Sequence, residues 1–266
     1  MKEFTPLRPA FLGALTRIDR VHVMAAAFGI GLAAFLAIEP TQSWLLLLLT
    51  VLAALASDGV VRSHPRNDFK HLDDTALYLF VPVLFTLAAG LFLEETAEGY
   101  WTVPTGLLMA VPFGLALQAE YHSVEGKGNA YHNARLILNV ATYMIAFLFY
   151  AVIYDFELAL VTTIFAVSVV SVLLAIEVLR EEAMETPRTL LFAGAIGLLM
   201  ADVAWALHFL PLEGGVAAIF LLLAFYLLTG LMHSYLGRRL NLRTASEFVA
   251  MATLGLVIVV ASHNLT

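Results

Sequence analysis

Four histidines in two neighbouring polar stretches are the residues best suited by type to bind a metal ion. His64 and His71 lie in residues 57–74, and His122 and His132 lie in the next polar stretch of the chain. Neutral imidazole and nearby carboxylates suit zinc or iron, and a catalytic metal needs three protein ligands and an open position. The histidine pairs are seven and ten residues apart, whereas two ligands on one helix face are three or four apart. A metal site is therefore an alternative prediction and not the leading one.

Two further ionisable residues lie within a long apolar run. Asp202 and His208 occur in the stretch "LLMADVAWALHFL", and ionisable side chains at membrane depth are costly and commonly functional. They are six residues apart, so they do not share a helix face. Because the basic residues are predicted on the other side of the membrane, Asp202 is expected to be protonated, hydrogen-bonded to a neighbouring helix, or part of a proton or cation pathway.

Two prolines inside apolar runs predict a third kind of site. Pro82 and Pro112 each free a carbonyl four residues earlier, at Tyr78 and Leu108, and such a group must find another donor. Both lie at comparable depth, where they could border a cavity that opens onto the histidine-bearing loops. The candidate cavity-lining residues are Pro82, Pro112, Glu120 and His233.

The elements that position these residues are predicted to be transmembrane helices. The chain has 266 residues, of which 61% are hydrophobic and 13% charged, and it has no cysteine. This composition is outside the range of soluble domains, and it excludes disulfides and cysteine-ligated metal centres. The prediction is an all-α integral membrane bundle of about nine helices, each about 20 residues long. They lie near 21–38, 43–61, 74–93, 101–119, 133–154, 157–178, 188–210, 215–236 and 246–263.

The distribution of charge predicts the orientation. If nine helices alternate across the bilayer, all 14 lysines and arginines fall on the side of the N-terminus. The positive-inside rule then places the N-terminus in the cytoplasm and the C-terminus outside. Trp44, Trp101 and Trp205 all fall near the outer face, where indole rings are enriched. We expect a multi-pass protein of the bacterial cytoplasmic (inner) membrane, with residues 1–20 as an amphipathic segment on the cytoplasmic face and residues 21–266 as a single bundle.

The polar stretch 57–74 also has a purely structural interpretation. Asp58 and Gly59 are expected to end the second helix, because glycine relieves the backbone there. Asp73 or Asp74 is expected to cap the third helix. On this interpretation the histidines are ordinary residues of an interfacial loop.

Three short motifs carry a resemblance to a known family. The segments "VVRSHP", "LYLFVPVLFTLAAGLFL" and "QAEYH" resemble an uncharacterised family of bacterial polytopic membrane proteins of unknown function, over roughly residues 50–155. The resemblance implies a multi-pass fold and supplies no catalytic residues.

Three functions of different class follow from these residues. The leading prediction is a non-catalytic membrane component, a scaffold or accessory subunit that binds lipid or another hydrophobic molecule. The alternatives are a transporter or proton-linked channel that uses Asp202, and a metal-dependent membrane enzyme at the cytoplasmic face. No cofactor is expected on the leading prediction, zinc or iron belongs to the third, and haem is disfavoured because the helix-end histidines lie on different helices. The expected partners are membrane lipids and either partner membrane subunits or further copies of the chain, without nucleic acid.

Overall fold

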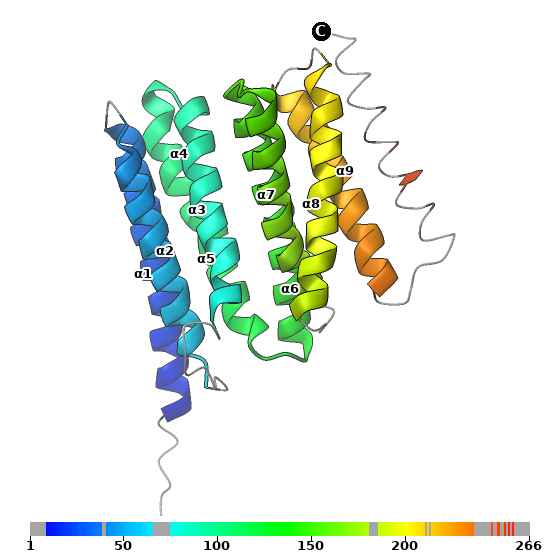
Figure 1. The fold of residues 1–266 in the computed structure, drawn as a ribbon. Coiled ribbons are helices and arrows are strands. Elements are labelled where there is room, and N and C mark those ends of the chain that lie inside the picture. Colours follow the sequence, from blue (N-terminus) through cyan, green and yellow to red (C-terminus); the bar gives the residue numbers. More distant parts are fainter. Residues whose placement is uncertain are drawn as a thin grey trace, which may run out of the picture. The chain divides into compact units, whose positions relative to one another are not determined.

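A computed structural model describes residues 9–38, 41–65, 75–180, 186–210, 212, 214–236 and the single positions 246, 249, 250, 253, 255 and 257. Every regular element in these residues is helical (Figure 1). The elements are α1 (Pro9–Ala37), α2 (Ser43–Arg62), α3 (Ala76–Thr96), η1 (Gly99–Trp101), α4 (Thr102–Leu108), α5 (Ala110–Ser123), α6 (Asn129–Asp155), α7 (Leu160–Leu179), α8 (Thr186–His208) and α9 (Gly214–Leu236).

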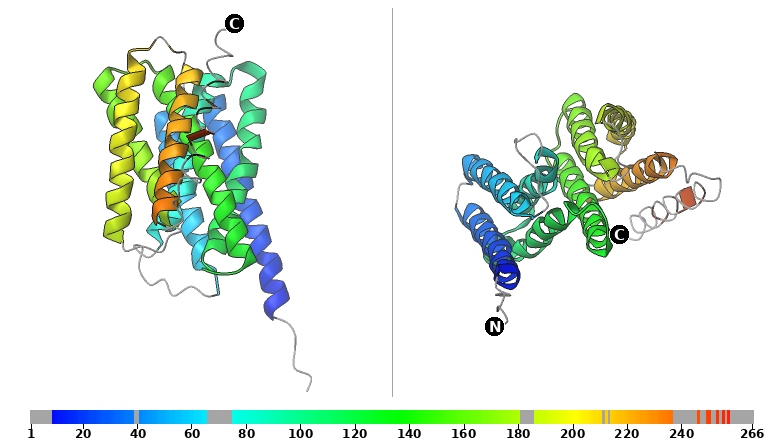
Figure 2. Two further views of the ribbon diagram at one scale, coloured as in Figure 1. Left: turned by 90° about the vertical axis from the view of Figure 1, so that its right-hand side faces the viewer. Right: turned by 90° about the horizontal axis from the view of Figure 1, so that it is seen from below.

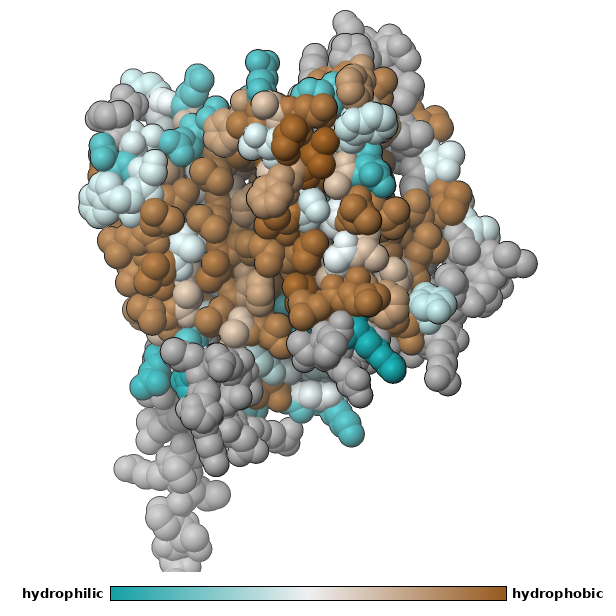
Figure 3. Space-filling model, in the orientation of Figure 1, coloured by the Kyte–Doolittle hydropathy of each residue, from teal (hydrophilic) through white to brown (hydrophobic). Residues whose placement is uncertain are grey.

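Eight helical stretches in the described part are long and apolar enough to cross a membrane. Each corresponds to one of the first eight predicted spans, and η1, α4 and α5 together form the fourth, Gly99–Ser123. The predicted ninth helix, 246–263, falls largely outside the described residues. On one face of the molecule, apolar side chains cover the middle of the helices and polar ones gather near their ends (Figure 3). The predicted all-helical, multi-pass architecture is confirmed, whereas the count of nine and the orientation of the termini stay predictions.

The chain divides into two compact units, Met1–Ile137 and Leu138–Thr266, so that α6 gives its first part to one unit and the remainder to the other. In the first unit α1 packs against α2, α4 and α5, and α3 packs against α2 and α5. Seen along the helices, α5 lies between α1 and the first part of α6 (Figure 2, right). Helix α1 runs without a break through residue 20, where we expected a surface segment to give way to the first span.

The contact between α1 and the fourth span depends on small residues. A side chain at Gly106 would place its Cβ 2.7 Å from the Cα of Ala33, and one at Gly29 would place it 2.8 Å from the Cβ of Ala110. Lipid tails are as apolar as leucine, so membrane helices associate through close backbone approach rather than through loss of water. The small residues recur every fourth position on both helices, as Ala25, Gly29 and Ala33 on α1 and Gly106, Ala110 and Gly114 on the fourth span.

Pro82 leaves α3 continuous, because another helix supplies the missing donor. The hydroxyl of Ser57 on α2 donates to the carbonyl of Tyr78 at 3.0 Å, and this is the carbonyl that Pro82 cannot reach with an N–H. Ser57 is 0% exposed. The predicted need of the Tyr78 carbonyl for a donor is therefore met by protein.

The fourth span is helical on both sides of Met109, three residues before Pro112. Within the predicted helix 101–119, α4 ends at Leu108 and α5 begins at Ala110 with Met109 between them. The N–H of Met109 donates to the carbonyl of Thr105 and that of Phe113 to the carbonyl of Met109, so helical hydrogen bonding continues through this residue. The phenyl ring of Phe113 then stacks on Phe28 with ring centroids 4.0 Å apart, which anchors the start of α5 to α1.

The expected end of the second helix at Asp58 and Gly59 is wrong, since α2 continues to Arg62. The carboxylate of Asp58 accepts hydrogen bonds from Arg62 at 2.8 Å and from Thr75 at 2.6 Å. The negative charge of Asp58 is therefore paired with a cation four residues later on the same helix, which favours continuation of the helix. The carboxylate also bonds to the residue directly before α3. Asp73 and Asp74 lie outside the described residues, and the residue directly before α3 is Thr75.

The second unit has a polar cluster at the centre of its packing. The hydroxyl of Tyr150 on α6 lies 2.8 Å from that of Ser171 on α7, and the hydroxyl of Tyr143 lies 3.0 Å from that of Thr229 on α9. Helix α8 packs against α7 and α9. These hydroxyl pairs hold α6 to α7 and α9.

Replacing Ser57 tests the carbonyl bond. We expect Ser57→Ala to lower the free energy of unfolding in detergent micelles by about 1–2 kcal/mol, because the Tyr78 carbonyl loses its donor. The matched control is Thr50→Ala on the same helix, whose hydroxyl only donates to the Leu46 carbonyl of its own helix. Equal losses in the two variants, measured by titration with a denaturing detergent, would contradict the assignment.

A methyl group at Gly106 tests the close helix contact. We expect Gly106→Ala to destabilise the protein by about 1–3 kcal/mol, because the backbone of Ala33 would have to move. At Gly194 on α8 an added Cβ meets nothing within 4 Å, so Gly194→Ala should instead stabilise by about 0.5–1 kcal/mol through helix propensity. The same unfolding titration compares the signs of the two changes.

Candidate binding cavity

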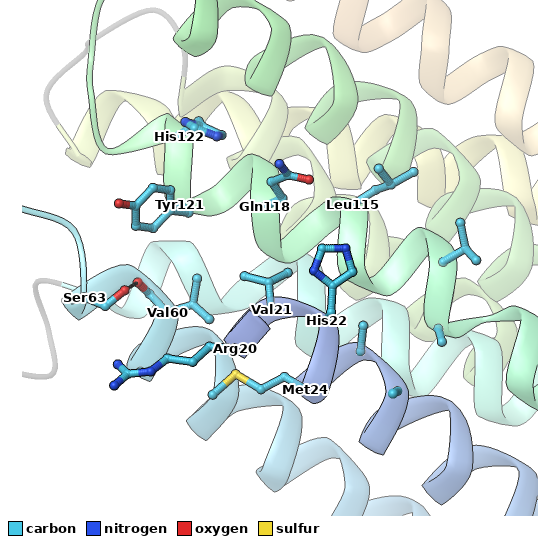
Figure 4. A pocket seen from close by; sticks show the side chains of 16 residues that line it. Arg20, Val21, His22, Met24, Val60, Ser63, Leu115, Gln118, Tyr121 and His122 are labelled. Carbon is cyan, nitrogen blue, oxygen red and sulfur yellow. Dashed lines mark hydrogen bonds between the residues drawn. The ribbon is translucent and has the colours of Figure 1, made fainter. Parts of the chain in front are cut away.

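A cavity of about 880 Å³ lies in the first unit between α1, α2 and α5. This volume is within the range of small-molecule sites. His22 rises from α1 into the space between α1 and α5, and Gln118 and Leu115 come from α5 on the other side (Figure 4). The site is thus built by three helices, and the small-residue contact joins two of them, α1 and the fourth span.

The walls are mostly apolar and the polar groups gather at one end. Side chains such as Met24, Ala25, Val60, Val111 and Leu115 form the walls. The polar end is formed by the last turns of α2 and α5 and the part of α1 beside them. Its polar residues are Arg20, His22, Ser63, Gln118, Tyr121 and His122.

The cavity is elongated along α5 and open on one side. Its lining on this helix extends from Ala110 to His122, which at 1.5 Å per residue is about 18 Å. Val111 is 60% exposed and Leu115 is 47% exposed, so part of the wall belongs to the outer surface of the helices. About 18 Å is somewhat more than half of the hydrocarbon thickness of a bilayer.

Two of the four predicted metal ligands come together beside the polar end. The carboxylate of Glu125 lies 3.5 Å from Nδ1 of His122 and 3.9 Å from Nε2 of His64. The ring of Tyr121 lies 4.7 Å from that of His64, centroid to centroid, and His64 is 6% exposed. The two polar stretches therefore converge through an acidic residue that the sequence interpretation had not selected.

The remaining predicted ligands do not join this cluster in the described structure. His132 is exposed on the first turn of α6, and His71 lies outside the described residues. Within the residues that are described, no three histidines or carboxylates are placed to hold a metal ion. The metal site of His64, His71, His122 and His132 stays a prediction.

The predicted intramembrane pair lies on the exposed side of α8. Asp202 and His208 are both exposed. Leu198 and Trp205, one turn before and after Asp202, are 67% and 54% exposed. In the second unit the carboxylate therefore belongs to an apolar outer surface, and a role in proton or cation movement stays a prediction.

None of the four predicted cavity-lining residues is among the described residues that line this cavity. Pro112 directly follows Ala110 and Val111, which line the wall. Glu120 is 0% exposed and accepts a hydrogen bond from Ser123 at 3.3 Å. Pro82 is buried in α3, and His233 is half-buried near the end of α9.

Sequence reasoning missed most of the cavity residues. Gln118, Tyr121 and His122 are three and four residues apart in "QAEYH", and this spacing puts them on one face of a helix. That signal was available. Arg20 and Gly59 had no comparable signal, because their place in the lining depends on how α1, α2 and α5 pack.

Comparison with known proteins yields a family and no nearer relative. No curated protein and no solved structure matches the chain. The model of a family described as a protein of unknown function, DUF5656, matches residues 18–262. The expected relation to an uncharacterised family is confirmed in that form, and because the match covers more than half of the chain, the protein belongs to the DUF5656 family.

Proposed function

We propose that the protein is a non-catalytic membrane component that binds an amphiphilic molecule from the bilayer in the cavity between α1, α2 and α5. The apolar part of the ligand lies along α5, and its polar head lies at the end formed by Arg20, Gln118 and His122. The observation that carries the proposal is the separation of apolar walls from a polar end in one elongated, laterally open cavity.

The guanidinium of Arg20 at the polar end can pair with an anionic head group. Among the described residues that line the cavity, Arg20 is the one with a permanently charged basic side chain. A guanidinium pairs well with phosphate oxygens. On the predicted orientation this end faces the cytoplasmic leaflet of a bacterial inner membrane, which attracts basic residues through its anionic lipids. Charge and shape thus support the same class of ligand, an anionic lipid.

The hydrogen bond of Ser63 argues against this serine as a nucleophile. The side chain of Ser63 donates to the Val60 carbonyl at 2.6 Å. A serine nucleophile requires a hydrogen bond to a base, and here the hydroxyl proton is engaged by its own helix. The polar groups at this end are accordingly expected to orient a head group.

Filling the cavity tests the proposal. Gly59 lines it, and an added Cβ there meets nothing within 4 Å, so Gly59→Leu should fill space without displacing backbone. We expect this variant to lower the affinity for phosphatidylglycerol at least about tenfold, because the larger side chain occupies the ligand's place. Native mass spectrometry of the protein in detergent micelles, titrated with the lipid, measures the change.

The matched control for Gly59→Leu is Gly194→Leu, at an open glycine of α8 that does not line the cavity. It should bind phosphatidylglycerol as the original protein does. Equal binding by all three proteins, each with the same melting temperature, would show that lipid does not occupy this cavity.

Removing the positive charge tests the head group. We expect Arg20→Gln to reduce the preference for phosphatidylglycerol over phosphatidylcholine about fivefold, since a basic residue near the membrane contributes about 1 kcal/mol toward an anionic lipid. Lys127→Gln, an exposed change outside the cavity lining, should leave the preference unaltered. Competition between the two lipids in the same micelles gives the ratio, and an unchanged ratio in Arg20→Gln would rule out a role for this charge.

A further inference from the structure

A second hollow lies on the other side of α5. It has a volume of about 300 Å³ and is bounded by α5 and the first part of α6. Its α6 wall extends from Ala130 to Ile137, about 10 Å along the helix. Most of the wall is apolar, and alanines at 119, 130 and 134 leave the space open.

The two hollows share three side chains of α5. Leu115, Gln118 and His122 line both of them. Their spacing of three and four residues makes one stripe along the helix. Because α5 lies between α1 and the first part of α6 (Figure 2), this stripe is a ridge with a hollow on each side.

The ridge is accessible from outside the helices. Leu115 and Gln118 are exposed, and His122 is half-exposed at the end of the ridge. On the α6 side, Ala130 and Asn133 are also exposed. A ligand that arrives from the bilayer can therefore contact both hollows at once without entering a closed chamber.

We propose that the ligand is a two-chain anionic phospholipid whose acyl chains lie on opposite sides of this ridge, an inference that rests on the proposed function. One acyl chain lies in the larger hollow against α1, and the other lies in the smaller hollow against α6. The glycerol and phosphate lie over Gln118 and His122, where the hollows meet, with Arg20 on one side and Asn133 on the other.

The chemistry of the lining selects two chains rather than one. A single chain needs one apolar channel below its head group, and the larger hollow provides that by itself. The smaller hollow adds a second apolar wall that begins at the same polar side chains and diverges from the first around α5. Two chains that branch from one glycerol match this arrangement, and each buried methylene adds to binding.

The experiment compares a two-chain lipid with its one-chain relative. Phosphatidylglycerol and lysophosphatidylglycerol of the same acyl length are titrated separately into the protein in detergent micelles, with native mass spectrometry as the readout. Ala130→Leu fills the smaller hollow at an exposed position and leaves the larger one unaltered. We expect this variant to reduce the ratio of two-chain to one-chain affinity about tenfold, through loss of contact with the second chain.

Two further variants make the result interpretable. Ala206→Leu, at an exposed alanine of α8, should keep the original ratio. Asn133→Leu fills the same smaller hollow from the next turn of α6, and it should reduce the ratio even if Ala130→Leu does not fold.

The two proposals fail in different ways. If both lipids bind and Gly59→Leu weakens both, but neither Ala130→Leu nor Asn133→Leu alters the ratio, the two-chain inference is wrong and the proposed function stands. If neither lipid binds, or Gly59→Leu has no effect on either, the proposed function is wrong as well.

Discussion

Close approach between α1 and the fourth span is the interaction on which the first unit depends. Water does not drive helices together inside a bilayer, so contact must come from backbones that can come near one another. At Gly29 and Gly106 the neighbouring helix already occupies the space that a methyl group would need. Ala25, Ala110 and Gly114 belong to this small-residue pattern and also line the cavity. The tight contact and the space beside it therefore share the same residues.

The two prolines lie in helices with different local hydrogen bonding. At Pro82 a buried hydroxyl from α2 reaches the Tyr78 carbonyl, and α3 continues as one helix. At Pro112 the fourth span passes through Met109, whose N–H donates to the Thr105 carbonyl and whose carbonyl accepts from Phe113. Ala110 and Val111, which directly precede Pro112, belong to the cavity wall.

Sequence reasoning could predict what depends on composition and local order, and could not predict partners brought together by packing. Hydropathy located the eight described spans, because about 20 apolar residues must cross the hydrocarbon. The need of the Tyr78 carbonyl for a donor followed from Pro82 alone. That Ser57 is the donor did not follow, because it lies 21 residues away on another helix. For the same reason the meeting of His64 and His122 at Glu125 was hidden, and so was the match between the small residues of α1 and those of α4 and α5.

The periodicity of α5 separates two kinds of polar residue that the sequence places side by side. Each residue turns the helix by about 100°, so Glu120 points about 200° around the axis from Gln118, whereas His122 returns to within about 40° of it. Glu120 is accordingly buried against the core, while Gln118 and His122 line both hollows. The position of Glu120 on the opposite face keeps its carboxylate away from the ligand. One turn and a half of helix thus turns a buried acid toward the interior and two polar side chains toward the ligand, while the carboxylate of Glu125 lies 3.5 Å from Nδ1 of His122 at the end of the ridge.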